Sequence, residues 1–199
     1  MTMQGNGMGA EPATTSFGPS ALATPANAIT ALRLLLAPVL FSMILDDVAS
    51  WPAFAMWVVL AGSDGIDGWV ARRMGTTRSG AFLDPLADKV LVIGALVCLV
   101  AVDRFSWVPV SVIAVREIAV SFYRSWFGRQ GLAIPARTSA KAKTFVQTLA
   151  VGFAIAPATE DIAWLADGLL WASVVLAVVS AVQYFHDGGR AATDMARTD

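Results

Sequence analysis

Residues 63–89 read SDGIDGWVARRMGTTRSGAFLDPLADK, and this stretch joins segments 48–62 and 90–102, which contain no charged residue. It holds four aspartates: Asp64, Asp67, Asp84 and Asp88. On a helix, residues three or four apart share a face, so each neighbouring pair of these carboxylates points the same way. An antiparallel hairpin with a short turn would bring both pairs to one depth. The stretch therefore predicts two membrane helices that present an acidic cluster close to their turn.

The composition of the whole chain is that of a membrane protein. Of its 199 residues, 56% are hydrophobic and 15% are charged, with a mean hydropathy of +0.63. Soluble domains carry about 25% charged residues. A spanning helix needs about 20 mainly apolar residues, and six segments qualify: 28–45, 51–73, 82–102, 106–127, 141–158 and 162–185. We therefore expect an all-α integral membrane protein with six transmembrane helices in a lipid bilayer.

The chain divides into one membrane domain with two tails. Residues 1–26 contain no Lys or Arg, so they lack the basic region of a signal peptide and are expected to be a disordered tail. The membrane domain covers 27–186, and 187–199 form a short cytoplasmic tail. Basic residues gather after the second, fourth and sixth predicted spans, which places both termini in the cytoplasm by the positive-inside rule. The near balance of 14 basic and 15 acidic residues gives no reason to expect nucleic-acid binding.

Four carboxylates in or beside membrane spans are costly unless something neutralises them. Oxygen ligands without a nearby histidine or cysteine favour a hard divalent cation, Mg²⁺ or Mn²⁺, over zinc. A purely structural salt-bridge cluster with Arg72 and Arg73 is the alternative. Glycines beside the aspartates favour the ligand site, because they weaken a helix but allow close approach of a ligand.

The spacing of these residues also carries a resemblance to a known family. Asp64-x2-Asp67-Gly68-x2-Ala71-Arg72, followed by Gly80-x3-Asp84-x3-Asp88, resembles the signature of the CDP-alcohol phosphatidyltransferases, integral membrane enzymes of six helices. Seven residues separate Arg72 from Gly80 here, where the family pattern has eight. Because the difference falls in a loop, we expect the metal site to be intact. The segments NAITALRLLLAPVLF (27–41), VREIAVSFYR (115–124) and KAKTFVQ (141–147) are similar to the branch that makes phosphatidylglycerophosphate.

The resemblance implies a reaction and a set of site residues. In this family an alcohol attacks the phosphoryl group of a CDP-linked lipid, here CDP-diacylglycerol, and CMP leaves. The four aspartates would hold two Mg²⁺ or Mn²⁺ ions, and Asp88 would also be the general base. The expected nucleotide contacts are Asn27, Thr30, Gly68, Arg72, Thr77 and Gly80. Helix N-capping is the alternative for Asn27 and Thr30. The resemblance also implies a homodimer in a bacterial cytoplasmic membrane, with the active site facing the cytoplasm.

Glycerol 3-phosphate, the acceptor of that branch, carries a phosphate that requires its own cations. Arg116, Lys141 and Lys143 are the candidates, because Arg116 lies inside an apolar span and the lysines begin the fifth one. A structural pair for Arg116 and a topological role for the lysines are the alternatives. Other acceptors remain open, namely phosphatidylglycerol, as in a cardiolipin synthase, or inositol phosphate. So do a cation transporter and a non-catalytic scaffold.

Overall fold

The computed structural model describes residues 25–74, 80–129 and 138–195, with side-chain surroundings at 28–63, 86–123, 125–126 and 142–186. Within these ranges the chain is helical apart from short connections. The elements are α1 (Pro25–Asp46), α2 (Trp51–Met74), α3 (Gly80–Ala101), α4 (Trp107–Arg129), α5 (Thr138–Ile155), the 3-10 helix η1 (Pro157–Ile162) and α6 (Ala163–Met195). The prediction of an all-α fold is confirmed, and an α-helix occupies each of the six predicted segments.

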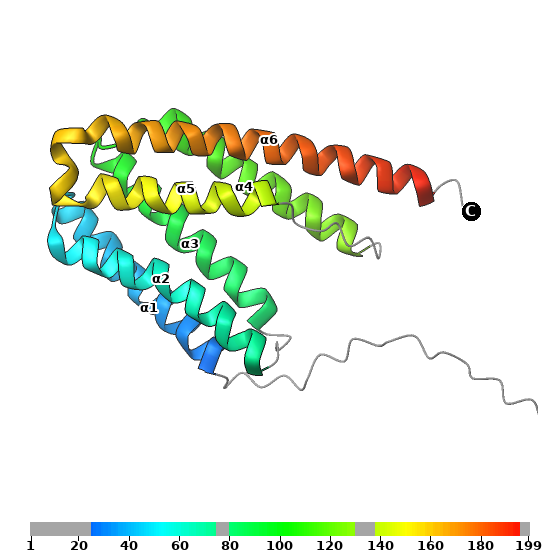
Figure 1. Cartoon of the computed structure of the whole chain (residues 1–199), viewed down its shortest axis with the longest axis horizontal. Coiled ribbons are helices and arrows are strands. Elements are labelled where there is room, and N and C mark those ends of the chain that lie inside the picture. The colour runs from blue at the N-terminus through cyan, green and yellow to red at the C-terminus, as the bar shows by residue number, and fades with distance from the viewer. Residues whose placement is uncertain (1–24, 75–79, 130–137, 196–199) are drawn as a thin grey trace, which may run out of the picture.

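The helices form two groups of three (Figure 1). In the first group, α1 packs against α2 and α3, and in the second, α6 packs against α5 and α4. The groups meet through contacts of α2 with α5 and of α3 with α4 and α5. They converge at the end that holds η1 and the α1–α2 connection, which we call the loop end, and they diverge toward the opposite end, which we call the signature end. The signature end is where α2 finishes and where α3 and α5 begin.

Local chemistry explains several helix ends. Ser50 and Ser106 cap α2 and α4, because their Oγ atoms accept hydrogen bonds at 3.4 Å from the backbone N–H groups of Ala53 and Val108. Helix α5 stops at Ile155, earlier than the predicted 158. The cause is Pro157: the residue before a proline is driven out of the helical region, and Ala156 has φ −77° and ψ 121°.

Helix α6 is longer than the sequence predicts. The prediction ends at 185, where the apolar run gives way to polar residues and glycines, but the helix continues to Met195. Backbone hydrogen bonds do not require apolar side chains, so a helix can extend beyond its apolar stretch. The last helical residues fall within the segment 187–199 predicted as a tail.

A shared core joins the two groups near the loop end. It contains Leu40 and Ile44 of α1, Trp57 of α2, and Val151 and Ile155 of α5, all between 0 and 2% exposed. The Trp57 indole Nε1 donates a hydrogen bond to the backbone oxygen of Thr148 at 3.2 Å, which ties α2 to α5. Helices α1 and α3 also pack closely, where Phe41 of α1 meets Gly94 of α3. A Cβ atom at Gly94 would lie 2.2 Å from the ring of Phe41, so any larger residue there would force the ring to move.

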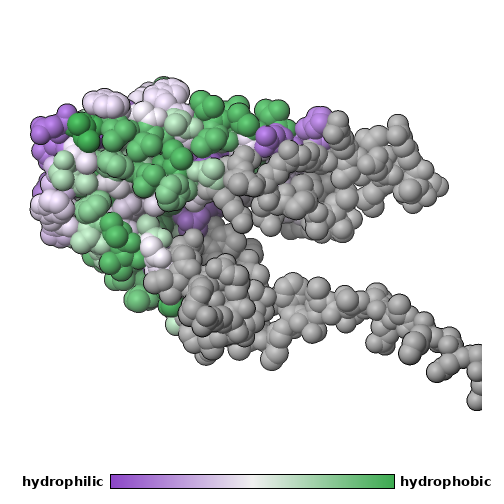
Figure 2. Space-filling model, in the orientation of Figure 1, coloured by the Kyte–Doolittle hydropathy of each residue, from purple (hydrophilic) through white to green (hydrophobic). Residues whose placement is uncertain are grey.

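The outer surface of the bundle is unusually apolar. Large apolar side chains such as Leu35, Phe122 and Trp164 are 70 to 74% exposed, and Figure 2 shows apolar residues spread over the visible sides of the helices. Exposed apolar surface on this scale is typical of contact with lipid rather than water. In the described part of the chain, two segments are long and apolar enough to cross a membrane: Ala28–Asp46 and Pro157–His186. Two further helical segments there are apolar but shorter: Trp51–Ser63 and Ala142–Ile155. These features indicate a membrane protein.

Candidate active site

The backbone places the four signature aspartates on two consecutive helices. Asp64 and Asp67 belong to α2, and Asp84 and Asp88 belong to α3. The predicted helical hairpin is therefore present, although residues 75–79 between the helices lie outside the described part of the chain. The side chains of Asp64, Asp67 and Asp84 also lie outside it, so their predicted contacts are untested. Asp88 is described and is half-buried.

Asp88 lines a cavity of about 830 Å³ between α2 and α5. The wall is mostly apolar, with aromatic residues from both helices. Four side chains bring polar groups to the part nearer the signature end: Arg33, Asp88, Thr144 and Thr148. Large, mainly apolar cavities with a few polar groups are typical of ligand sites. An acidic residue at one end of such a cavity fits a ligand with a polar head and an apolar body.

Arg33 is a candidate site residue that the sequence analysis missed. It lies on α1, is 1% exposed, and lines the same cavity as Asp88. Its Nε donates a hydrogen bond at 3.2 Å to the Oγ of Ser63, the residue before Asp64. A sequence signal existed, because Arg33 is a charge inside an apolar predicted span, and such a charge is a functional candidate by default.

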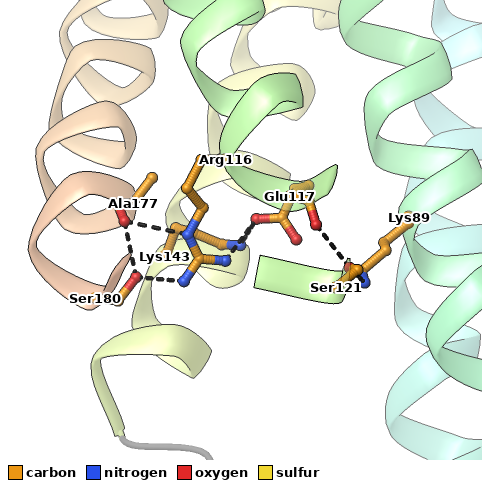
Figure 3. A network of polar contacts seen from close by, with 7 residues as sticks. All are labelled: Lys89, Arg116, Glu117, Ser121, Lys143, Ala177 and Ser180. Atoms are coloured by element: carbon orange, nitrogen blue, oxygen red, sulfur yellow. Dashed lines mark hydrogen bonds and ion pairs between the residues drawn. The ribbon is translucent and has the colours of Figure 1, made fainter. Parts of the chain in front are cut away.

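A second cluster of polar side chains lies among the helices α4, α5 and α6 (Figure 3). The carboxylate of Glu117 accepts from Arg116 Nη1 at 2.9 Å and from Lys143 Nζ. Arg116 also donates from Nε to the backbone oxygen of Ala177 at 3.1 Å and from Nη2 to Ser180 Oγ at 2.7 Å. The side chains of Arg116, Glu117 and Lys143 are 10, 11 and 4% exposed. We call these three side chains, together with that of Ser180, the Glu117 network.

Lys89 extends the polar region toward α3. Its Nζ donates to Ser121 Oγ, which itself donates to the backbone oxygen of Glu117 at 2.6 Å (Figure 3). Lys89 and Glu117 both line a smaller cavity of about 350 Å³ between α3 and α4. Lys89 directly follows Asp88 on α3. The carboxylate of Asp88 therefore lines the large cavity, whereas the cation of Lys89 lines the smaller one.

The described side chains around Glu117 carry more positive than negative charge. Three cations, Lys89, Arg116 and Lys143, accompany the single carboxylate of Glu117. Buried charge is costly unless it is neutralised. A site with this surplus suits an anionic ligand. The sequence analysis identified Arg116 and Lys143 but assigned no role to Glu117, Lys89 or Ser180.

The other predicted site residues are placed only in part. Thr30 is fully buried on α1, and because α1 begins at Pro25, neither Asn27 nor Thr30 is an N-cap. The capping alternative is therefore wrong for both. The surroundings of the remaining predicted contacts lie outside the described side chains: Asn27, Gly68, Arg72, Thr77, Gly80 and Lys141.

The described side chains contain no group of three or more acidic, histidine or cysteine residues that could hold a metal. The predicted metal ligands other than Asp88 fall outside that part, so the metal site stays a prediction. The donor set itself fits Mg²⁺ or Mn²⁺. It consists of carboxylate oxygens carried by two consecutive helices, and hard divalent cations prefer oxygen ligands.

Comparison with known proteins identifies the class to which this fold and site belong. The family model for CDP-alcohol phosphatidyltransferase matches residues 23–179, and the chain belongs to that family. A "Probable phosphatidylglycerophosphate synthase" of Mycobacterium tuberculosis (strain ATCC 25618 / H37Rv) is 34% identical over 173 residues, which cover 84% of this chain and 82% of the relative. A "CDP-diacylglycerol--glycerol-3-phosphate 3-phosphatidyltransferase" of Pseudomonas fluorescens is 36% identical over 184 residues, 87% of this chain and 92% of the relative.

Proposed function

We propose that this protein transfers the phosphatidyl group from CDP-diacylglycerol to sn-glycerol 3-phosphate, giving phosphatidylglycerophosphate and CMP. Family membership supports the transfer chemistry, and the names of the relatives support these two substrates. One observation carries the proposal: Asp88 faces a long apolar cavity. That arrangement suits a donor whose reacting phosphoryl group lies beside a carboxylate while its acyl chains remain in an apolar environment.

In the proposed reaction, Asp88 accepts the proton of the attacking hydroxyl group of glycerol 3-phosphate. The hydroxyl oxygen then forms a bond to the phosphorus that carries diacylglycerol, and the bond from that phosphorus to the CMP phosphate breaks. Asp64, Asp67, Asp84 and Asp88 would hold two Mg²⁺ or Mn²⁺ ions. These ions would supply charge neutralisation for the diphosphate and for the leaving CMP.

Residues of the first half would recognise the nucleotide. Arg72 lies about one turn beyond Asp67 on α2 and would bind the nucleotide phosphates. Gly68 would leave room for the cytidine. Asn27, Thr30, Thr77 and Gly80 are the further proposed contacts. Arg33 would support this region through its hydrogen bond to Ser63, next to the first signature aspartate.

The acceptor phosphate would bind at the Glu117 network. Arg116 has a planar fork suited to two phosphate oxygens, and three of its N–H groups are engaged by Glu117, Ala177 and Ser180. Within the part of the chain that the structure describes, those three bonds leave two of the five N–H groups of the guanidinium for a ligand. Lys143 adds charge beside it, and Lys141 is the third proposed cation. Glu117 would position Arg116 and Lys143 without contacting the phosphate.

We further propose six transmembrane helices with both termini in the cytoplasm, in a bacterial cytoplasmic membrane. The distribution of basic residues supports this orientation, and it places the signature end on the cytoplasmic side, where the water-soluble acceptor and CMP are found. The exposed tryptophans of the loop end, Trp51, Trp107 and Trp164, would lie at the opposite interface. A homodimer is also proposed.

The test is to supply purified protein in phospholipid micelles with CDP-diacylglycerol and one acceptor at a time, and to identify the lipid product by mass spectrometry. Glycerol 3-phosphate, phosphatidylglycerol and inositol phosphate are compared. We expect phosphatidylglycerophosphate and an equal amount of CMP, only with Mg²⁺ or Mn²⁺ present. A product from one of the other acceptors alone would assign the protein to another branch of the family, and no CMP from any acceptor would contradict an enzymatic role.

Replacement of single aspartates tests the metal ligands. Asp64→Asn, Asp67→Asn and Asp84→Asn each keep the size of the side chain and remove its charge. We expect activity to fall by orders of magnitude and the concentration of Mg²⁺ needed for half-maximal activity to rise. If all three variants kept the Mg²⁺ dependence of the original protein, the metal assignment would be wrong.

A further inference from the structure

The large cavity extends well beyond Asp88. At its polar end it is lined by Asp88 and Thr144, and at the loop end by Trp51, Phe153 and Ala156. Along α5, Thr144 and Gly152 are separated by about 12 Å at 1.5 Å per residue, and the cavity continues past Gly152. Half the apolar core of a bilayer is about 15 Å thick, so an acyl chain that spans one leaflet would pass Gly152.

Gly152 lies where the cavity meets a fixed aromatic ring. Trp57 is 2% exposed, and its indole is held by the hydrogen bond to the Thr148 oxygen. A Cβ atom at Gly152 would be 3.4 Å from Trp57 Nε1 and 3.6 Å from Cδ1. A methyl group is therefore just accommodated. A larger side chain would occupy the cavity, because the ring cannot move aside without losing its hydrogen bond.

We infer that Gly152, opposite the fixed ring of Trp57, determines the length of the acyl chain that the donor site accepts. This inference rests on the proposed function, since the occupant is one acyl chain of CDP-diacylglycerol. The lining of the cavity runs from Asp88 to the loop end and is mostly apolar, and along α5 it extends from Thr144 to Ala156, about 18 Å at 1.5 Å per residue. The absence of a side chain at 152 leaves the passage open for the distal half of a long chain.

The end of the cavity is firmly built. Thr159 of η1 donates from Oγ1 to the backbone oxygens of Phe153 and Ala156, at 2.6 and 2.8 Å, and also lines the cavity. These bonds hold η1 against the end of α5. A chain that passes Gly152 therefore meets a segment that these bonds hold in place, and a change at 152 alters access to it rather than its far end.

A competition experiment tests the inference. Full-length protein in detergent micelles receives equal amounts of dioctanoyl and dipalmitoyl CDP-diacylglycerol with glycerol 3-phosphate, and mass spectrometry gives the ratio of long to short product. This ratio depends on the two kcat/KM values and is independent of how much protein is folded. An octanoyl chain has half the carbons of a palmitoyl chain and reaches about half as far along the cavity, so the substitution should affect the long donor more than the short one.

For Gly152→Leu we expect the ratio to fall at least 10-fold, and for Gly152→Ala about 2-fold. The matched control is Gly168→Leu on α6, where nothing lies within 4 Å of the added Cβ and the residue does not line the cavity; its ratio should stay that of the original protein. An unchanged ratio in Gly152→Leu, or an equal fall in Gly168→Leu, would overturn the inference. If Gly152→Leu gave no product, an unchanged ratio in Gly152→Ala would overturn it.

The two proposals fail in different ways. If the original protein formed no phosphatidylglycerophosphate from either donor, the proposed function would be wrong. If it formed that lipid from both donors and the substitutions at 152 left the ratio unaltered, the function would stand and the assignment of Gly152 would be wrong.

Discussion

The two halves of the bundle differ in the charged side chains that they contribute to the candidate site. The first half, α1 to α3, carries all four signature aspartates, and its described side chain Asp88 faces the large cavity. The second half, α4 to α6, gathers the buried cations Arg116 and Lys143 around one carboxylate. Under the proposed function, the half rich in carboxylates needs metal ions to bind the donor diphosphate. The half rich in cations binds the acceptor phosphate directly.

Under the proposed function, this contrast would let the reacting groups meet between the halves. Two phosphate-bearing substrates repel each other, so a site that binds both needs a separate source of positive charge for each. Asp88 and Lys89 are neighbours on α3, and they face the two different cavities. Under the proposed function, that turn of α3 would lie between the donor region and the acceptor region.

The largest effect is expected in the first half. Asp88→Asn preserves the size of the side chain but cannot accept the proton of the attacking hydroxyl. General bases contribute about 10²- to 10⁴-fold to rates, so we expect kcat for CMP release to fall about 10³-fold. The thermal unfolding temperature should change little, because Asp88 is half-buried at the edge of a cavity.

Asp167→Asn is the matched control for that variant. Asp167 is an acidic residue of the second half, half exposed near the loop end, and it pairs with Arg104 at 3.5 Å. Its replacement should leave kcat within about 2-fold. If Asp88→Asn retained full activity, the base would have to be another residue, and the division of roles between the halves would have to be redrawn.

The next largest effect concerns the stability of the second half. Glu117→Gln leaves Arg116 and Lys143 buried without their negative partner. Breaking a buried ion pair on one side costs about 3–5 kcal/mol. We therefore expect a clearly lower unfolding temperature in detergent, measured by intrinsic tryptophan fluorescence.

Ligand rescue distinguishes an acceptor site from a merely structural pair. If the two cations bind a phosphate, saturating glycerol 3-phosphate should raise the unfolding temperature of Glu117→Gln, because ligand binding stabilises the folded state. Glycerol without phosphate is the control and should have no such effect. No stabilisation by glycerol 3-phosphate in either the original protein or the variant would leave the Glu117 network structural.

The sequence predicted the helices well because apolar length is a local property. All six segments became helices, and the two helices of the predicted hairpin, α2 and α3, are present. The predicted helix ends were wrong in two places: at α5, where the effect of a proline was overlooked, and at α6, where the sequence carries no apolar signal. The end of α5 was set by Pro157, and the extension of α6 to Met195 has no apolar signal.

The site was harder to predict, because its partners lie far apart in the sequence. Glu117 meets Lys143 across 26 positions, and Arg116 meets Ser180 across 64. Neither pairing follows from residue spacing on one helix. Arg33 was overlooked although a charge inside an apolar span is a signal, and its partner Ser63, 30 residues away, does not follow from residue spacing. By contrast, the aspartate site could be predicted from the sequence because its whole pattern lies within 27 residues, and it stays a prediction.

A smaller effect is expected for Arg116 itself, measured on acceptor binding. Arg116→Ala should raise the apparent KM for glycerol 3-phosphate about 10- to 100-fold, because a charge-assisted hydrogen bond contributes about 1.5–3 kcal/mol. The fold should survive, since Glu117 keeps Lys143 and Ser180 keeps its bond of 3.0 Å to the Ala177 oxygen.

The KM values for the two substrates must be compared, because only a selective rise for glycerol 3-phosphate indicates an acceptor site. The KM for CDP-diacylglycerol should change by less than about 2-fold in Arg116→Ala. Arg116→Lys should show an intermediate loss for glycerol 3-phosphate, since a lysine keeps the charge but not the fork. Equal loss for both substrates would indicate a folding defect, and no loss for either would move the acceptor site away from the Glu117 network.

The smallest effect is expected for an ion pair of the same half at the loop end. Arg104 contacts Asp167 at 3.5 Å, donates to the backbone oxygen of Ala163 at 3.1 Å and lies 5.1 Å from the ring centre of Phe105. Asp167 is half exposed, and such pairs contribute about 0–1 kcal/mol. Arg104→Ala should therefore lower the unfolding temperature only slightly and leave both KM values unchanged, whereas Arg116→Ala changes one of them strongly. If Arg104→Ala raised the KM for glycerol 3-phosphate as much as Arg116→Ala, loss of any arginine in this half would weaken acceptor binding. The selective role of the buried network would then be refuted.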